Sequence, residues 1–90
     1  MRVNVLYMTQ IRRSAGRATE AVESAGPLTL LELLRTLAER HGAGFRGLLL
    51  DETEEPRKSL LFFVGDEHAD LQRSLRDGDA VTILAPMAGG

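Results

Sequence analysis

The chain closes with Asp77-Gly78-Asp79-Ala80-Val81-Thr82-Ile83-Leu84-Ala85-Pro86-Met87-Ala88-Gly89-Gly90. The apolar run from Ala80 to Leu84 predicts a strand, with Val81 and Ile83 sharing one face. Pro86 has no N–H to donate to a neighbouring strand, so the strand should end before it. The residues after Pro86 are small apart from one methionine and offer little to a core. We therefore expect a domain over residues 1–84 and a flexible arm over residues 85–90.

Two consecutive glycines at the end of the sequence suit one kind of chemistry. An enzyme that acts on a C-terminal carboxylate must thread that terminus into a narrow channel, and glycine has no side chain to obstruct it. An ordinary frayed end accounts for the same residues, because two glycines fall there by chance about 0.5% of the time. Taken alone, the tail leaves both interpretations open.

The composition is that of one globular domain of 90 residues, with 43% apolar and 27% charged side chains. A net charge of −2 and few aromatic residues disfavour nucleic-acid binding. The absence of cysteine excludes disulfides, thiolate metal sites and a cysteine nucleophile. No apolar run approaches membrane-spanning length and no signal-like region opens the chain. We expect a cytoplasmic protein that binds neither membrane nor nucleic acid.

The first half of the chain predicts a β-hairpin followed by one helix. Residues 3–8 and 17–23 alternate as strands, and the loop between them contains Arg12, Arg13 and Gly16. Thr29 with Glu32 three residues later forms a capping box at a helix start. Gly42 should end that helix. The residues with helical spacing are Leu30, Leu33, Leu34, Leu37 and His41.

The second half predicts mainly strands. Residues 48–50 should form a short helical turn or strand over the core, and the acidic residues 51–55 a solvated loop. Residues 60–64 read as a strand, Gly65 and Asp66 as a tight turn, and residues 69–71 as a short strand that pairs back. Leu75 should be a core residue in the loop that follows. One amphipathic helix facing one sheet predicts a two-layer α+β domain.

This order of elements resembles the MoaD/ThiS-type sulfur carriers, which are ubiquitin-like β-grasp proteins. The matching pieces are residues 5–12, 29–41, 63–66 and, most specifically, 77–90. The resemblance implies a mixed four- to five-stranded sheet with one main helix packed on one face. The connection over residues 44–58 is longer than in thiamine-type carriers. It is more similar to molybdopterin-type carriers and to the carriers used for cysteine synthesis.

The resemblance also implies a reaction at the C-terminus, in which the chain is a protein substrate and not an enzyme. An E1-like enzyme would use ATP to adenylate the carboxylate of Gly90, and a persulfide-derived sulfur would displace AMP to leave a thiocarboxylate. A thiocarboxylate is ionised and nucleophilic at neutral pH without any cysteine. The chain itself would bind no cofactor. Pro86, Met87, Ala88 and Gly89 would guide the terminus into the pockets of its partners.

Two kinds of sulfur acceptor fit the resemblance. One is the large subunit of molybdopterin synthase, in which case this chain is the small subunit, and the other is a pyridoxal-phosphate-dependent cysteine synthase. By analogy with the apolar patch of ubiquitin-like proteins, Met8, Phe62 and Leu84 would form the partner docking face. These residues can equally be core residues or scattered surface apolar residues, which are normal. The phase of Phe62 and Phe63 is also open, because the run from Leu60 to Val64 does not alternate.

Two alternatives to a sulfur carrier remain. The chain can be a ubiquitin-like modifier joined to other proteins through Gly90, or a β-grasp interaction module whose glycines are incidental. The two histidines, His41 and His68, match no metal motif. We expect His41 at the helix end, where a cation suits the helix dipole, His68 in an exposed loop, and no metal site.

Overall fold

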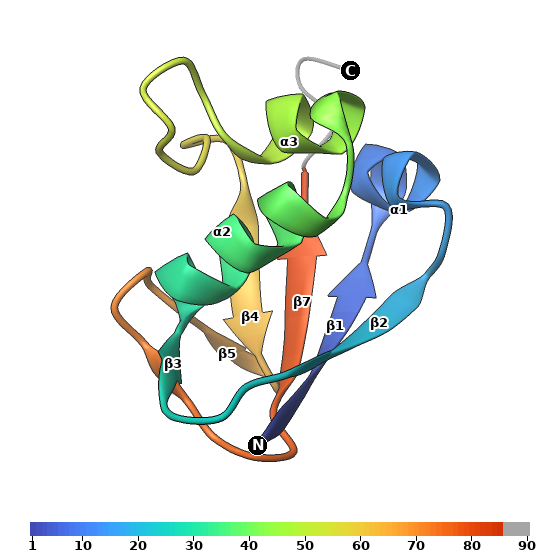
Figure 1. Ribbon diagram of the computed structural model, residues 1–90. Coiled ribbons are helices and arrows are strands. Elements are labelled where there is room, and N and C mark those ends of the chain that lie inside the picture. Colours follow the sequence, from blue (N-terminus) through green and yellow to red (C-terminus); the bar gives the residue numbers. More distant parts are fainter. Residues whose placement is uncertain (86–90) are drawn as a thin grey trace.

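Five strands form one mixed sheet in the order β2-β1-β7-β4-β5 (Figure 1). The structure is a computed structural model, and it describes residues 1–85. The strands of this sheet are β1 (Arg2–Tyr7), β2 (Thr19–Glu23), β4 (Leu61–Val64), β5 (Glu67–His68) and β7 (Ala80–Leu84). β1 and β7 are parallel neighbours, while the other pairs are antiparallel. The predicted mixed sheet and opening hairpin are confirmed.

One face of the sheet packs against helices and forms the core. Along β1 and β7 the inward residues are fully buried, namely Val3, Val5, Tyr7, Val81 and Ile83. They share one apolar cluster with four leucines of α2 (Leu30–Arg40), which crosses the sheet in front of β7 and β4 (Figure 1). Each buried leucine contributes about 1.5–3 kcal/mol before the entropy of ordering is counted. The alternation along β7 confirms the predicted faces.

The start of α2 has the predicted capping box. The Glu32 N–H donates to the Thr29 hydroxyl at 3.2 Å, and the Thr29 N–H donates to the Glu32 carboxylate at 2.9 Å. The helix ends at Arg40, with His41 as its C-cap. Gly42 then precedes another helix, α3 (Ala43–Leu49), which buries Phe45 and Leu49. The expected covering segment near residues 48–50 is therefore helical and begins earlier than the apolar run indicates.

The loop predicted between the first two strands contains a helix, α1 (Thr9–Ala15), so that prediction was wrong. Only Ile11 of α1 is buried, and one apolar residue carries no periodicity to detect. The helix ends at Gly16, whose φ of 77° is left-handed and whose N–H donates to the Arg12 carbonyl. A glycine after two arginines is a helix C-terminal signal, and it was the available clue.

The strand that pairs back on β4 is β5 at residues 67–68, two residues earlier than expected, and the Ala69 N–H also donates to the Phe62 carbonyl at 2.9 Å. A two-residue turn with Gly65 at φ 60° places Glu67 directly opposite Val64. Residues 69–71 follow β5 as a loop, in which Ala69 is buried. Leu75 is buried as predicted, within a second small sheet that joins β3 (Leu28–Thr29) to β6 (Ser74–Leu75).

Across residues 1–85, no helix is long and apolar enough to cross a membrane. The proposed arm begins at Ala85, and the rest of it lies outside the described residues.

Candidate functional site

β1 and β7 end together at one edge of the sheet, beside α1 (Figure 1). Tyr7 lies opposite Ile83, and the N–H of Met8 donates to the Ile83 carbonyl at 3.2 Å. The Thr9 hydroxyl lies 3.1 Å from the carbonyl oxygen of Ala85. These contacts tie the last described residue to the start of α1. We call this junction of Met8, Thr9, Ile83 and Ala85 the exit corner.

Thr9 has an unusual backbone at this corner. Its φ is 54°, in the left-handed region that a β-branched residue rarely adopts. The conformation costs roughly 1–2 kcal/mol relative to the right-handed form. The Thr9 hydroxyl compensates in part, since it lies 2.7 Å from the Met8 carbonyl as well as 3.1 Å from that of Ala85. The strain therefore lies where β7 leaves the sheet.

The predicted tail residues Pro86, Met87, Ala88, Gly89 and Gly90 lie outside the described residues. What the structure describes is their starting point at Ala85.

Among the predicted docking residues, the placement of Phe62 on the open face was wrong. It is only 7% exposed, and it lies opposite the fully buried Ile83 in the pairing of β4 with β7. Opposite residues in a sheet share a face, so Phe62 belongs to the core. The outward residues of β4 are Leu61 and Phe63, both half-buried. The continuous apolar run concealed this phase, which the strand pairing determines.

The open face carries an apolar strip. Thr82 lies opposite both Leu6 and Phe63, and Leu61 lies opposite Leu84. Leu84 is half-buried, and Met8, at the end of β1, is 44% exposed. We call Leu6, Leu61, Phe63, Leu84 and Met8 the open-face strip. His68, exposed on β5, meets Phe63 edge-on with ring centroids 5.6 Å apart.

The structure contains a buried polar cluster under the exit corner that was not predicted from the sequence. Glu20 of β2 is 7% exposed, and among residues 1–85 it is the only charged residue that is buried. Its carboxylate accepts hydrogen bonds from the Tyr7 hydroxyl at 2.6 Å and the Arg40 guanidinium at 3.0 Å. It also lies 2.7 Å from His41 Nε2, which carries the hydrogen because an ionised carboxylate only accepts. The alternation of β2 places Glu20 on the same face as Val22, and this was the signal.

The cluster fixes protonation states as well as positions. Burial raises the pKa of Glu20, but hydrogen bonds from Tyr7, His41 and Arg40 outweigh it and lower the pKa to about 2. Burial, and then the bond to Glu20, raise the pKa of Tyr7 well above its ordinary value. Glu20 thus stays ionised and Tyr7 neutral near pH 7. His41 is at the helix end as predicted, and its ring packs on Phe45 with centroids 4.4 Å apart.

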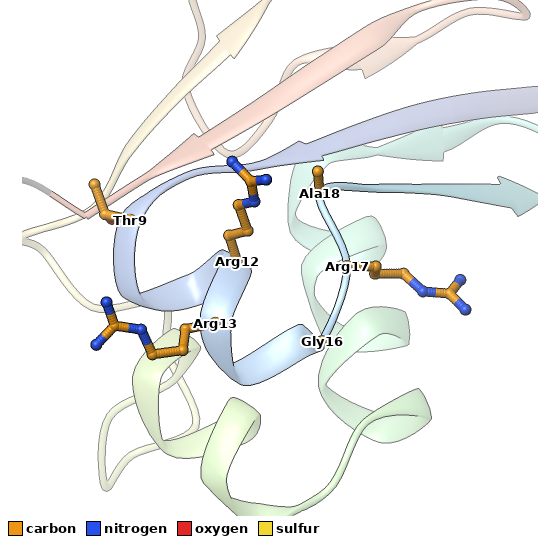
Figure 2. A pocket seen from close by; sticks show the side chains of 6 residues that line it. All are labelled: Thr9, Arg12, Arg13, Gly16, Arg17 and Ala18. Atoms are coloured by element: carbon orange, nitrogen blue, oxygen red, sulfur yellow. The ribbon is translucent and has the colours of Figure 1, made fainter.

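An open depression of about 540 Å³ lies on the outer side of α1. Figure 2 shows the side chains that line it, which include three arginines and no acidic residue. The lining residues are Thr9, Arg12, Arg13, Gly16, Arg17 and Ala18. Thr9 joins this depression to the exit corner. Elsewhere in residues 1–85, no three histidine, aspartate or glutamate side chains gather in a way that would hold a metal ion.

Comparison with known families matches the sequence pattern of the ThiS family to residues 5–90. The chain belongs to the ThiS family. The match covers nearly the whole chain, including every element at the exit corner. It confirms the resemblance to MoaD/ThiS-type carriers and makes this protein a member of the ubiquitin-like β-grasp sulfur-carrier group.

Solved structures agree with the ThiS-family assignment. A chain of the Amycolatopsis orientalis BexX/CysO complex is 34% identical, with a TM-score of 0.71 over 98% of this chain and 99% of that one. SAMP1 from Haloferax volcanii has a TM-score of 0.91 at 20% identity over 100% of both chains. A protein described as molybdopterin converting factor subunit 1, from Pyrococcus furiosus, has a TM-score of 0.76 at 24% identity, covering 97% and 99%. The last two likenesses concern the fold alone. No curated protein matches this ThiS-family chain.

Proposed function

We propose that the protein is a sulfur carrier whose C-terminal Gly90 is adenylated by an E1-like enzyme and then carries sulfur as a thiocarboxylate. The observation that supports this most directly is the ThiS-family match, which runs through residue 90. The exit corner supports it as well, because β7 delivers the chain to a fixed point at Ala85.

The chemistry follows from the weakness of a carboxylate as an electrophile. A carboxylate oxygen of Gly90 attacks the α-phosphorus of ATP, and pyrophosphate leaves. The nucleophilic sulfur of a donor then attacks the carbonyl carbon of the acyl-adenylate, and AMP leaves with the bonding electrons. Where the donor is a persulfide, the product is an acyl disulfide. A thiol then attacks the sulfur that belongs to the donor's own side chain, forms a new disulfide with it, and releases the thiocarboxylate of Gly90. The ATP belongs to the activating enzyme, so the carrier needs no cofactor of its own.

The exit corner limits where the activating enzyme binds. Five residues follow Ala85, and a fully extended chain of five residues reaches at most about 18 Å. The enzyme must therefore bring its nucleotide within that distance of Ala85. Pro86, Met87, Ala88 and Gly89 then occupy its channel, for which small side chains are suited.

The open-face strip is the surface we assign to partner docking. Met8 and Leu84 remain from the sequence prediction, and Phe63 takes the place of Phe62. Aromatic and methionine side chains are enriched at the centres of protein interfaces. Because Met8 also belongs to the exit corner, a partner seated on this strip has direct access to the tail.

Two acceptors remain in the proposal, the large subunit of molybdopterin synthase and a pyridoxal-phosphate-dependent cysteine synthase. The 34% identity to a chain of the BexX/CysO complex supports a CysO-like partnership as the first one to test. In either case the protein is the sulfur donor of a larger system in the cytoplasm, where ATP is available.

The test is ATP–pyrophosphate exchange by the activating enzyme from the same source, with the carrier as substrate. Deletion of Gly90, or Gly89→Phe, should abolish exchange while the circular dichroism spectrum and unfolding midpoint stay unchanged. Gly26→Phe is the matched control, since a Cβ added at Gly26 meets no atom within 4 Å. Unchanged exchange by the Gly90 deletion would refute the proposal. Covalent adducts between Gly90 and lysines of other proteins would move the assignment to a modifier.

A further inference from the structure

The stretch from Thr9 to Ala18 carries an unbalanced charge. It contains Arg12, Arg13 and Arg17 and no acidic residue, although the whole chain has a net charge of −2. Acidic residues gather elsewhere, at positions 51–55 and 66–70. The outer side of α1 is thus a basic surface on an acidic protein.

These arginines have no acidic partner within the described part of the chain. Ion pairs there involve Arg35, Arg40, Arg46 and Arg73, each with a glutamate. None of the arginines at positions 12, 13 and 17 has a carboxylate of residues 1–85 within 4.0 Å. All three residues are exposed. Three positive charges are therefore available to an external group.

The arrangement of the guanidinium groups indicates what kind of group fits. Figure 2 shows the three side chains extending from α1 and the following loop in three different directions. A phosphate is bound by donors that converge on one point. Guanidinium groups that diverge across an open depression of about 540 Å³ instead suit several carboxylates spread over a protein surface.

The position of the basic surface indicates which protein supplies those carboxylates. Thr9 lines the depression and its hydroxyl reaches Ala85 at the exit corner. Arg12 and Arg13 line the same depression as Thr9, so they lie beside the point from which the chain continues past Ala85.

We propose that Arg12, Arg13 and Arg17 form an electrostatic contact surface for an acidic patch on the protein that receives the C-terminal tail. This inference rests on the proposed function for the identity of the partner. Exposed charges at an interface rim act mainly on the rate of association and lose their effect in salt. The three arginines thus orient the partner so that its channel faces the tail.

The first experiment compares two triple variants in the ATP–pyrophosphate exchange assay. Arg12→Gln/Arg13→Gln/Arg17→Gln removes the basic surface. Arg2→Gln/Arg35→Gln/Arg76→Gln removes the same charge from exposed positions outside the depression. At about 0.05 M salt the first variant should raise the KM for the carrier roughly tenfold with little change in kcat, and at about 0.5 M salt the difference should vanish. The control should stay within about twofold of the wild type.

A second experiment does not depend on the activating enzyme. The isotope-labelled protein is titrated with a poly-glutamate peptide and, separately, with ATP alone, and amide chemical shifts are followed. The peptide should perturb residues 9–18, and the perturbation should disappear in the Arg12/Arg13/Arg17 variant.

The outcomes separate this inference from the proposed function. Peptide binding at residues 9–18, with no exchange activity in the wild-type protein, would uphold the acidic-partner surface and refute adenylation. Normal exchange with equal KM in both triple variants would overturn the basic surface and leave the carrier proposal standing. Shifts at residues 9–18 with ATP but not with the peptide would overturn it in favour of a phosphate site.

Discussion

Glu20 shows how a single residue holds the functional end of this protein together. Its buried carboxylate joins β1 through Tyr7 and the end of α2 through Arg40 and His41. Burying an unpaired charge is very costly, whereas a fully hydrogen-bonded one is tolerated. Because Tyr7 is followed directly by Met8, the cluster also positions the exit corner.

The lowered pKa of Glu20 predicts an acid-sensitive contribution to stability. The pKa falls from 4.5 to about 2 on folding, so the contribution is complete above the unfolded value and disappears as pH falls toward 2. It amounts to about 3 kcal/mol near pH 7. Glu20→Gln should lower the free energy of unfolding by that order at pH 7. The gap between variant and wild type should close near pH 2.

Urea unfolding of the wild type and of Glu20→Gln across this pH range measures the difference in their free energies of unfolding. All other carboxylates are shared, so the difference isolates Glu20. A gap of equal size at pH 7 and near pH 2 would show that the carboxylate is not stabilised by ionisation.

Thr9 predicts an unusual order of substitutions, because its φ of 54° favours glycine. Thr9→Gly and Thr9→Ala both remove the hydroxyl that reaches Ala85, but only glycine relieves the backbone. Thr9→Gly should therefore be more stable than Thr9→Ala by about 1 kcal/mol. Denaturant midpoints compare the two, and Thr36→Gly against Thr36→Ala, within α2, should give the opposite order. The same order at both positions would contradict a left-handed Thr9.

Phe62, Phe63 and Glu20 also show a limit of prediction from sequence. Phe62 and Phe63 are adjacent in an apolar run, and only the pairing of Phe62 with Ile83 places one inward and the other outward. Glu20 was visible in the alternation of β2, but its three donors come from Tyr7, Arg40 and His41, whose proximity is tertiary.

At the scale of elements, α2 was predictable because its signals are local. Thr29 and Glu32 lie three residues apart, and the leucines from Leu30 to Leu37 repeat with the helical period over about two turns. α1 was not predictable from periodicity, since seven residues with one buried side chain carry no repeat. Short helices of this kind are stabilised by their position between neighbouring elements more than by their own sequence.

The capping box makes a prediction for α2. Thr29→Ala removes the hydroxyl that accepts the Glu32 N–H, and it should lower the free energy of unfolding by about 1 kcal/mol. Thr36→Ala is the control inside the same helix, because its hydroxyl donates only to the Glu32 carbonyl and such bonds do not stabilise helices. Chemical denaturation should separate the two, and equal losses would count against the capping box.

At the scale of the whole molecule, the parallel pairing of β1 with β7 is the feature that matters most. It brings the two ends of the described chain into one sheet, with Asn4 opposite Ala80 and Tyr7 opposite Ile83. Nothing local in either strand identifies the other as its neighbour, because the contact spans most of the sequence. The resemblance to β-grasp proteins predicted a mixed sheet, but the identity of the parallel neighbours comes from the structure.

The same pairing explains why one corner of a small protein carries three features. Figure 1 shows α1 beside the ends of β1 and β7. The open-face strip, the basic surface of α1 and the start of the C-terminal arm all include residues at this end of the sheet. In the carrier function that we propose, a partner seated there would contact all three at once and so receive the terminus in a defined direction.

The most direct test of the carrier function is the intact mass of the protein after incubation with the activating enzyme, ATP and a sulfur donor. We expect one sulfur atom in place of one oxygen, located at Gly90 by fragmentation, with no such gain when ATP is omitted or Gly90 is deleted. A protein that keeps its original mass with the activating enzymes of its own source, under conditions in which a known carrier is converted, would contradict the account.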